Sequence, residues 1–347
     1  METVEHVVVG AGPAGLRAAQ VLAEAGREVL VLEKNDEVGP KTCAGGLTRK
    51  AVEELRALGL PEDAGVAHLA HALFPGADRL VPLEAEQAVV RTLSRRRLGE
   101  FQAAWTRAAG AEIRTAAPVS RIDLEARTLE ADGRKIRWRR LIGADGSRSA
   151  VRRALGLPSP RVYFAAEFNI RGLALEHLFI SNDSPALANG YFWIFPHEDY
   201  TSVGAGVHKA LVPPAAVRPY IEHRMEAMGI DPGDTPYEGA TIEIDHPGFD
   251  FPGGVHLVGD AAGTASGLTA EGIYAALITG EETARRILDP GYPSPKTQAW
   301  LRLKRKHDAI ARAWMRRPIR DLCFAALPAL CRFPPTRRRI CTLFLDP

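Results

Sequence analysis

The sequence predicts an α/β fold, in which a parallel β-sheet carries an inserted antiparallel sheet and is followed by a helical C-terminal segment. Three short glycine-rich motifs along the 347 residues are the main observation. They are Gly10-Ala-Gly12-Pro-Ala-Gly15, Gly143-Ala-Asp145-Gly146 and Gly259-Asp260-Ala-Ala-Gly263. Each follows an apolar run of the kind that forms a buried parallel strand. A chain of this length allows two interleaved domains.

The first motif stands inside a complete βαβ unit that spans residues 6–33. Gly10 fits a tight turn, Gly12 lets the backbone approach a pyrophosphate, and Gly15 allows the helix to pack closely on the strand. The helix N-terminus supplies amides and partial positive charge for phosphates. Glu33 ends the second strand and can accept a hydrogen bond from a ribose hydroxyl. This unit predicts a dinucleotide site without separating FAD from NAD.

The second and third motifs repeat the pattern of a strand that ends in aspartate beside glycine. Asp145 and Asp260 can each accept a ribityl or ribose hydroxyl, while adjacent amides face phosphate. The arrangement resembles the flavoprotein superfamily of p-hydroxybenzoate hydroxylase, in which these elements accompany the N-terminal motif. The three motifs in this order therefore indicate bound FAD. The resemblance also implies a cofactor contact from Arg95, whose neighbours Arg96 and Arg97 leave the register open.

Further stretches resemble the geranylgeranyl reductase family, over roughly residues 4–290. They are Lys41-Thr-Cys43-Ala-Gly45-Gly46-Leu47, the aromatic stretch 190–196, the glycine-containing stretch 200–207, and Gly267-Leu-Thr-Ala-Glu-Gly272-Ile-Tyr274. Hydroxylases of the superfamily usually carry histidine and prolines after Gly-Asp-Ala-Ala, whereas this chain has Gly263. It departs from the family in reading Cys-Ala-Gly-Gly where Cys-Gly-Gly-Gly is commoner. The family implies reduction of double bonds in prenyl chains.

The motifs and the resemblance together predict the cofactor contacts. The expected FAD-binding residues are Gly10, Gly12, Pro13, Ala14, Gly15, Glu33, Lys34, Cys43, Ala44, Gly45, Arg95, Val119, Asp145, Gly259, Asp260, Gly267, Leu268, Gly272 and Ile273. A helix that runs from the Gly267 loop to about Leu288 would point its N-terminus at an anionic reduced flavin and stabilise it by roughly 0.3–1 kcal/mol. An external donor, NAD(P)H or ferredoxin, is expected.

The aromatic stretch predicts a substrate pocket. Strand alternation places Tyr191, Trp193 and Phe195 on one face, ahead of Pro196, with the intervening residues on the other face. The alternative interpretation is two layers of ordinary core. Tyr191, Cys43 and water are the candidate proton donors. No adjacent His or Lys of obvious geometry marks Cys43 as a reactive thiolate.

The motifs imply a discontinuous domain organisation. We expect a Rossmann-type FAD-binding domain at 1–60, 93–158 and 250–290, a substrate or cap domain at 61–92 and 159–249, and a basic helical segment at 291–347.

The C-terminal segment changes the charge balance. From Trp300 onward twelve Lys and Arg face three Asp, a net charge of +9, so the rest of the chain carries −7. Such a segment fits an anionic membrane surface or a helical cap whose arginines lie in water. Nucleic-acid binding is not expected, because no aromatic-interleaved groove accompanies the charge. The four cysteines have no metal-ligand spacing. With neither a basic leader nor a membrane-spanning run, a cytoplasmic protein, peripheral at the inner membrane face in the first interpretation, is expected.

Three functions remain open from the sequence. The first is an FAD-dependent reductase of carbon–carbon double bonds in an apolar isoprenoid substrate. The second is an NAD(P)H-dependent monooxygenase that hydroxylates an aromatic compound, and the third is a non-catalytic flavin or lipid carrier. The substrate, the electron donor and the oligomeric state are not determined by the motifs.

Overall fold

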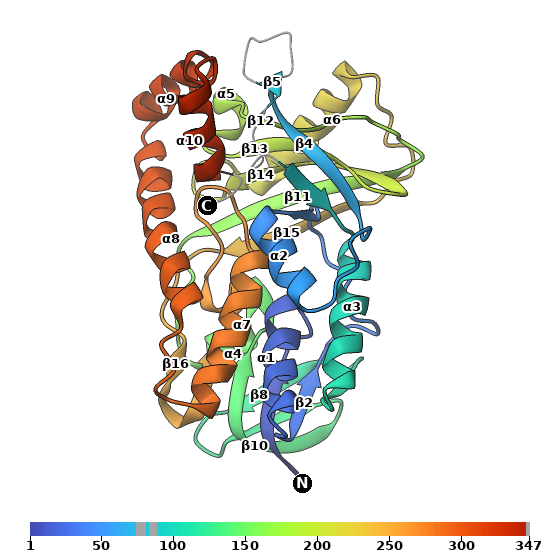
Figure 1. Ribbon diagram of the computed structural model, residues 1–347, viewed down its shortest axis with the longest axis vertical. Helices are drawn as coiled ribbons and strands as arrows, with labels where there is room; N and C mark the ends of the chain where they lie inside the picture. Colours follow the sequence, from blue (N-terminus) through green and yellow to red (C-terminus); the bar gives the residue numbers. More distant parts are fainter. Residues whose placement is uncertain (74–80, 83–88, 345–347) are drawn as a thin grey trace.

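A computed structural model describes residues 1–73, 81–82 and 89–344. Two β-sheets are stacked along the long axis of the molecule, with the N-terminus at the far end of the first (Figure 1). The first sheet has the strand order β16-β17-β10-β1-β2-β7, with a β8–β9 hairpin paired to β10. Its strands are β1 (Glu2–Val9), β2 (Val29–Leu32), β7 (Glu112–Arg114), β8 (Val119–Asp123), β9 (Thr128–Ala131), β10 (Arg134–Gly143), β16 (Asp250–Phe251) and β17 (Val255–Leu257).

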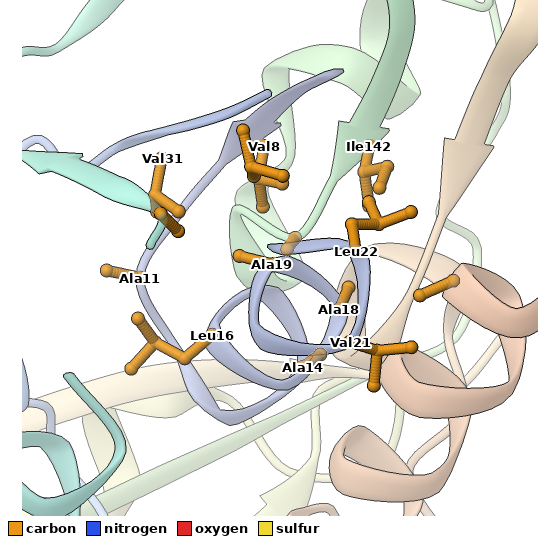
Figure 2. Close-up of a cluster of buried hydrophobic side chains, with 14 of the residues drawn as sticks. Val8, Ala11, Ala14, Leu16, Ala18, Ala19, Val21, Leu22, Val31 and Ile142 are labelled. Carbon is orange, nitrogen blue, oxygen red and sulfur yellow. The ribbon is translucent and has the colours of Figure 1, made fainter. Parts of the chain in front are cut away.

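The central strands β1, β2, β7, β10 and β17 of this sheet are parallel. Helices α1 (Pro13–Glu24), α3 (Arg95–Ala108) and α7 (Ile273–Leu288) pack together beside it. Figure 2 shows Ala19 and Leu22 of α1 against Val8 and Ile142 of the sheet. Helix α7 contacts α1 so closely that a Cβ on Gly280 would lie 2.2 Å from the Ala14 carbonyl oxygen. Burial of this apolar seam fixes the glycine-rich ends of the parallel strands relative to α7.

The second sheet has the order β15-β11-β14-β13-β12-β4-β6-β3, with β5 paired to β4, and its described pairs are antiparallel except for β4 with β12. Helix α6 (Val217–Ala227) covers one face, where Ile221 and Met225 pack on Phe192. The other face is turned toward the glycine-rich loops of the first sheet. The strands are β3 (Gly46–Leu47), β4 (Val66–Leu73), β5 (Val81–Pro82), β6 (Val89–Thr92), β11 (Val162–Arg171), β12 (Leu178–Ser181), β13 (Tyr191–Pro196), β14 (Tyr200–His208) and β15 (Tyr237–Glu243).

Shorter helices complete the two layers. They are α2 (Arg49–Ala57), α4 (Ala150–Ala154) and α5 (Ser184–Leu187). Strand β3, in the stretch that we expected to belong to the cofactor domain, pairs with β6 of the second sheet. The domain bounds themselves stay a prediction, and residues 74–80 and 83–88 of the expected 61–92 segment lie outside the described residues.

The C-terminal segment is folded onto the rest of the chain as α8 (Pro295–Trp314), α9 (Arg317–Cys331) and α10 (Pro334–Phe344). Figure 1 shows α8 running along one side of the molecule, with α9 and α10 beside the second sheet. Buried polar groups anchor α8: the Trp300 indole donates to the Thr264 carbonyl at 2.9 Å, and Lys304 donates to the Ile244 carbonyl at 2.7 Å and to Asp308 at 3.1 Å. Within the described residues, no helix combines the length and the apolar character that crossing a bilayer requires.

Candidate functional site

The three glycines of the turn after β1 differ in the space around them. Gly10 has a φ of +103°, and a Cβ there would lie 2.5 Å from the Ala144 carbonyl oxygen. A Cβ on Gly15 would lie 2.1 Å from the Gly10 carbonyl oxygen. A Cβ on Gly12 would meet no atom within 4 Å. Gly10 and Gly15 are therefore required by packing, whereas the space beside Gly12, at the N-terminus of α1, is available to a ligand.

Glu33 lies at the end of β2, beside this turn, and is 9% exposed. Its carboxylate accepts the Ala11 N–H at 2.9 Å and the Asn35 N–H at 3.0 Å. A carboxylate has about four acceptor positions, so Glu33 can still accept a hydrogen bond from a hydroxyl group. The Ala117 N–H donates to the Glu33 carbonyl, which brings the start of β8 at Val119 to the same edge. Lys34 follows Glu33 and is exposed.

The three neighbouring arginines at the start of α3 differ in their hydrogen-bond and ion-pair partners. Ser94 caps the helix by accepting the Arg97 N–H at 3.2 Å. Arg96 is paired with Glu37, and Arg97 with Glu198. Arg95 instead has a buried Nε without a hydrogen-bond partner among the described residues. Within the described part of the chain, the predicted cofactor contact thus falls on the one arginine of the three that forms no ion pair.

The two aspartates differ in their surroundings. One oxygen of Asp145 accepts the Ala150 N–H at 2.5 Å, whereas Oδ1 is buried without a partner in the described chain. Burial raises the pKa of this carboxyl. Asp260 instead forms an ion pair with Lys41 at 3.1 Å, and a Cβ on Gly272 would lie 3.3 Å from its Oδ1. Asp260 thereby connects the third glycine motif to the cysteine loop and to the start of α7.

Helix α7 runs from Ile273 to Leu288, and the loop that the sequence predicts precedes it. The hydroxyl of Ser266 accepts the Leu268 and Thr269 N–H groups, each at 3.1 Å, and Ala270 has a φ of +56°. These local bonds compete with helical ones and keep the segment as a loop. The Gly267 carbonyl accepts from the Tyr163 hydroxyl at 2.8 Å, which ties the loop to the second sheet.

The loop also packs on the C-terminal helices. Leu268 is buried against Trp314 and Phe324. Ile273, the first residue of α7, packs against a separate cluster that includes Leu47 and Leu98. The predicted cofactor residues of the third motif are therefore held from several sides.

Two glycines of the cysteine loop lie under aromatic side chains. A Cβ on Gly45, whose φ is +71°, would lie 2.6 Å from the ring of His197, and one on Gly46 would lie 2.5 Å from the ring of Phe195. The His197 Nε2 donates to the Ala44 carbonyl at 2.9 Å, and burial lowers the pKa of His197 to about 4. Both glycines are therefore required for packing against β13 and the residue after it. The contact of Gly45 with the cofactor stays a prediction.

Glu167, a residue that sequence reasoning missed, holds the cysteine loop in place. Its carboxylate, 1% exposed, accepts the Cys43 N–H at 2.8 Å and the Ser202 hydroxyl at 2.8 Å. The Trp193 indole N–H donates in turn to the Ser202 oxygen at 2.9 Å. Burial raises the pKa of Glu167. A glutamate within the apolar alternation of residues 162–170 is the signal that could have identified it.

The predicted alternation along β13 is confirmed. Trp193 and Phe195 belong to a buried cluster that includes Cys341 of α10, whereas the intervening residues pack under α6. The Tyr191 hydroxyl donates to the Thr269 carbonyl at 3.0 Å, and burial raises its pKa. The stripe thus faces the loop before α7 and is covered by α10.

Pro196 ends this strand. Its carbonyl accepts from the Thr92 hydroxyl at 2.6 Å and from His68 at 2.9 Å. Its assignment to a substrate pocket, like that of the aromatic stripe, stays a prediction.

Comparison with known proteins identifies the family. Residues 3–227 match a family model described as an FAD binding domain. A digeranylgeranylglycerophospholipid reductase of Methanopyrus kandleri is 32% identical, over 79% of this chain and 77% of the relative. A menaquinone reductase of Mycolicibacterium smegmatis is 30% identical, over 87% of this chain and 80% of the relative.

A solved structure shows the same fold. A geranylgeranyl bacteriochlorophyll reductase-like protein from Thermoplasma acidophilum has a TM-score of 0.73 and 24% identity, over 90% of this chain and 88% of that chain. The expected combination of a Rossmann-type FAD-binding sheet, an inserted antiparallel sheet and C-terminal helices is thereby confirmed. The chain therefore belongs to the geranylgeranyl reductase family of FAD-dependent oxidoreductases.

Proposed function

We propose that this protein reduces carbon–carbon double bonds of an isoprenoid lipid. The observation that carries the proposal is the position of the aromatic stripe of β13, which lies against the Cys43 loop and bonds the loop before α7 through Tyr191. An apolar wall beside a flavin site suits a long hydrocarbon substrate. The two reductase relatives support this substrate class, since one is named for a geranylgeranyl phospholipid and the other for menaquinone.

The residues present fit FAD at the edge of the first sheet. Open space beside Gly12 at the N-terminus of α1 suits the pyrophosphate, and the remaining acceptor positions of Glu33 suit a ribose hydroxyl. The unpartnered Arg95 Nε and Asp145 Oδ1 are buried polar atoms, which normally have partners. We assign both to the cofactor. When bound, FAD supplies a hydride.

The protein's own contribution is to orient the substrate and to hold charge and protons. The N-terminus of α7 at Ile273 would favour negative charge on the ring of a flavin held beside it. Alkene reduction also needs a proton for the second carbon, and the candidate donors are Tyr191, Cys43 and water. Because burial raises the pKa of Tyr191, its hydroxyl stays protonated near neutral pH. An external donor, NAD(P)H or ferredoxin, would reduce the cofactor.

A product assay tests the proposal. The flavin-loaded protein is reduced with dithionite under nitrogen, so that the natural donor is not needed, and is incubated with a geranylgeranyl phospholipid or menaquinone. We expect mass spectrometry of chain fragments to show a gain of two hydrogen atoms in the prenyl chain for each double bond reduced, since dithionite alone reduces the quinone ring of menaquinone. Heat-inactivated protein and free FAD, reduced in the same way, are the controls. A product that has gained oxygen in air, with none reduced under nitrogen, would establish hydroxylation instead.

A further inference from the structure

Helix α9 is apolar on two sides, and only one side is covered. On the covered side of α9, Phe324 and Cys331 are buried, and Phe324 packs against Trp314 of α8. The opposite side exposes four large apolar side chains. They are Ile319 at 38%, Leu322 at 72%, Leu330 at 42% and, just after the helix, Phe333 at 62%.

These four residues form one stripe. At 100° per residue, spacings of three and eight place positions 319, 322 and 330 within a narrow arc of α9. The Phe333 N–H donates to the Leu330 carbonyl at 3.3 Å, which continues the turn past the end of the helix. Among the described residues only Met1, Leu69 and Met228 are large apolar side chains with comparable exposure elsewhere. Single exposed apolar residues are normal on a protein surface, whereas a contiguous set marks an interaction site.

The segment around the stripe is strongly positive. Residues 309–344 contain eight arginines and one acidic residue, Asp321. Asp321 accepts a hydrogen bond from the Ser184 hydroxyl at 2.5 Å and forms an ion pair with Arg317 at 3.3 Å. Arg316, Arg332, Arg338 and Arg339 are exposed. A second copy of this chain would bring the same positive charge to a symmetric interface, which disfavours self-association through this surface.

A hollow adjoins the stripe. It is a shallow hollow, largely open to solvent, of about 600 Å³, and the described residues that line it are Pro334, Pro335, Arg338, Arg339 and Thr342. The Thr342 hydroxyl already donates to the Arg338 carbonyl at 3.0 Å, but the two guanidinium groups are suitable donors for the phosphate oxygens of a lipid headgroup. Apolar side chains flanked by arginines are typical of segments that lie in the interface of an anionic bilayer.

We propose that α9 and the start of α10 form a docking surface for anionic membranes, through Ile319, Leu322, Leu330 and Phe333 and the arginines around them. The inner side of α10 contributes Cys341 to the cluster that contains Trp193 and Phe195. Docking would therefore bring the element that covers the aromatic stripe to the bilayer. The docking itself does not depend on which reaction the protein catalyses.

Vesicle flotation of the flavin-loaded protein tests the proposal. Vesicles of phosphatidylcholine alone are compared with vesicles that also contain phosphatidylglycerol. We expect binding to the anionic vesicles and its loss at high salt, because screening weakens charge attraction. The pairs Leu322→Gln with Phe333→Gln, and Arg338→Gln with Arg339→Gln, should each lower the partition coefficient by roughly tenfold or more.

Matched control variants lie on other surfaces. They are Met228→Gln, at an exposed apolar residue, and Arg134→Gln with Lys135→Gln, at exposed cations of β10, and all should float like the wild type. Equal binding of the docking variants and the wild type would overturn the proposal. So would a change in oligomeric mass without a change in flotation, which would indicate a protein interface. Complete competition by inorganic phosphate at constant ionic strength would identify a free-phosphate site instead.

Discussion

Gly12→Val should yield a folded protein that has lost its flavin, whereas Gly15→Val should not fold. A Cβ at Gly12 meets nothing within 4 Å, and its backbone, with φ −81° and ψ 177°, is extended and open to valine. The side chain would fill the space assigned to the pyrophosphate, so we expect FAD affinity to fall by about a hundredfold or more, roughly 3 kcal/mol. A Cβ at Gly15 would instead lie 2.1 Å from a backbone oxygen, and such overpacking costs about 3 kcal/mol or more.

The measurement must separate cofactor loss from misfolding. Bound FAD itself raises the apparent stability of the folded state, so the unfolding free energies of flavin-free proteins should be compared. We expect flavin-free Gly12→Val to lose no more than about 1 kcal/mol relative to the wild type, because Gly12 is the N-cap of α1, a position at which valine is less favourable. Flavin content after purification gives the second readout. If Gly12→Val kept one FAD per chain, the assignment of the pyrophosphate to this turn would be wrong.

Glu167→Leu should lower turnover by about a hundredfold, with FAD still bound. The substitution leaves the Cys43 N–H and the Ser202 hydroxyl without their acceptor, and each buried unpaired group costs roughly 1–3 kcal/mol. Relief of that cost would require the Cys43 loop to move away from the aromatic strand. Glu167→Gln keeps an oxygen for the Cys43 N–H and should recover most of the activity. A positioning role predicts that kcat falls more than KM rises, because the loop is displaced beside the reacting atoms.

The pH dependence of stability gives an independent readout for Glu167. Burial raises its pKa above the ordinary value of 4.5, so the folded state binds this proton more tightly than the unfolded state does. The resulting stabilisation is fully present below pH 4.5 and is lost as the pH rises through the raised pKa. The unfolding free energy of the wild type relative to Glu167→Gln should therefore decrease from pH 4.5 toward neutrality. An unchanged difference over this range would show that Glu167 is not a buried carboxyl of raised pKa.

The sequence was most informative where local rules determine the structure. Strand and turn geometry predicts the βαβ turn at Gly10 to Gly15 and the alternation along residues 191–195. The structure confirms both. Glu167 and His197 were missed because their partners, Cys43 and Ala44, are more than a hundred residues away in the chain. No local pattern encodes such contacts, although a glutamate in an apolar strand indicates that some partner exists.

The C-terminal segment shows a further limit. The segment after Trp300 offered a membrane surface and a folded cap as alternatives. The structure shows that its helices fold onto the molecule, through buried groups such as Lys304, while α9 still presents an exposed apolar stripe. A basic amphipathic pattern alone does not show which of its apolar faces the fold covers.

The most direct test of the proposed reaction is whether an alkene alone reoxidises the flavin. The flavin-loaded protein is reduced under nitrogen, the excess reductant is removed, and the sample is mixed with a geranylgeranyl phospholipid, which has no quinone ring to accept the electrons, while the flavin absorbance is followed. The account predicts that the oxidised spectrum returns in the absence of oxygen, with one double bond reduced per flavin. If the flavin stayed reduced until air was admitted, and an aromatic compound then gained oxygen, the protein would be a hydroxylase and the account would be contradicted.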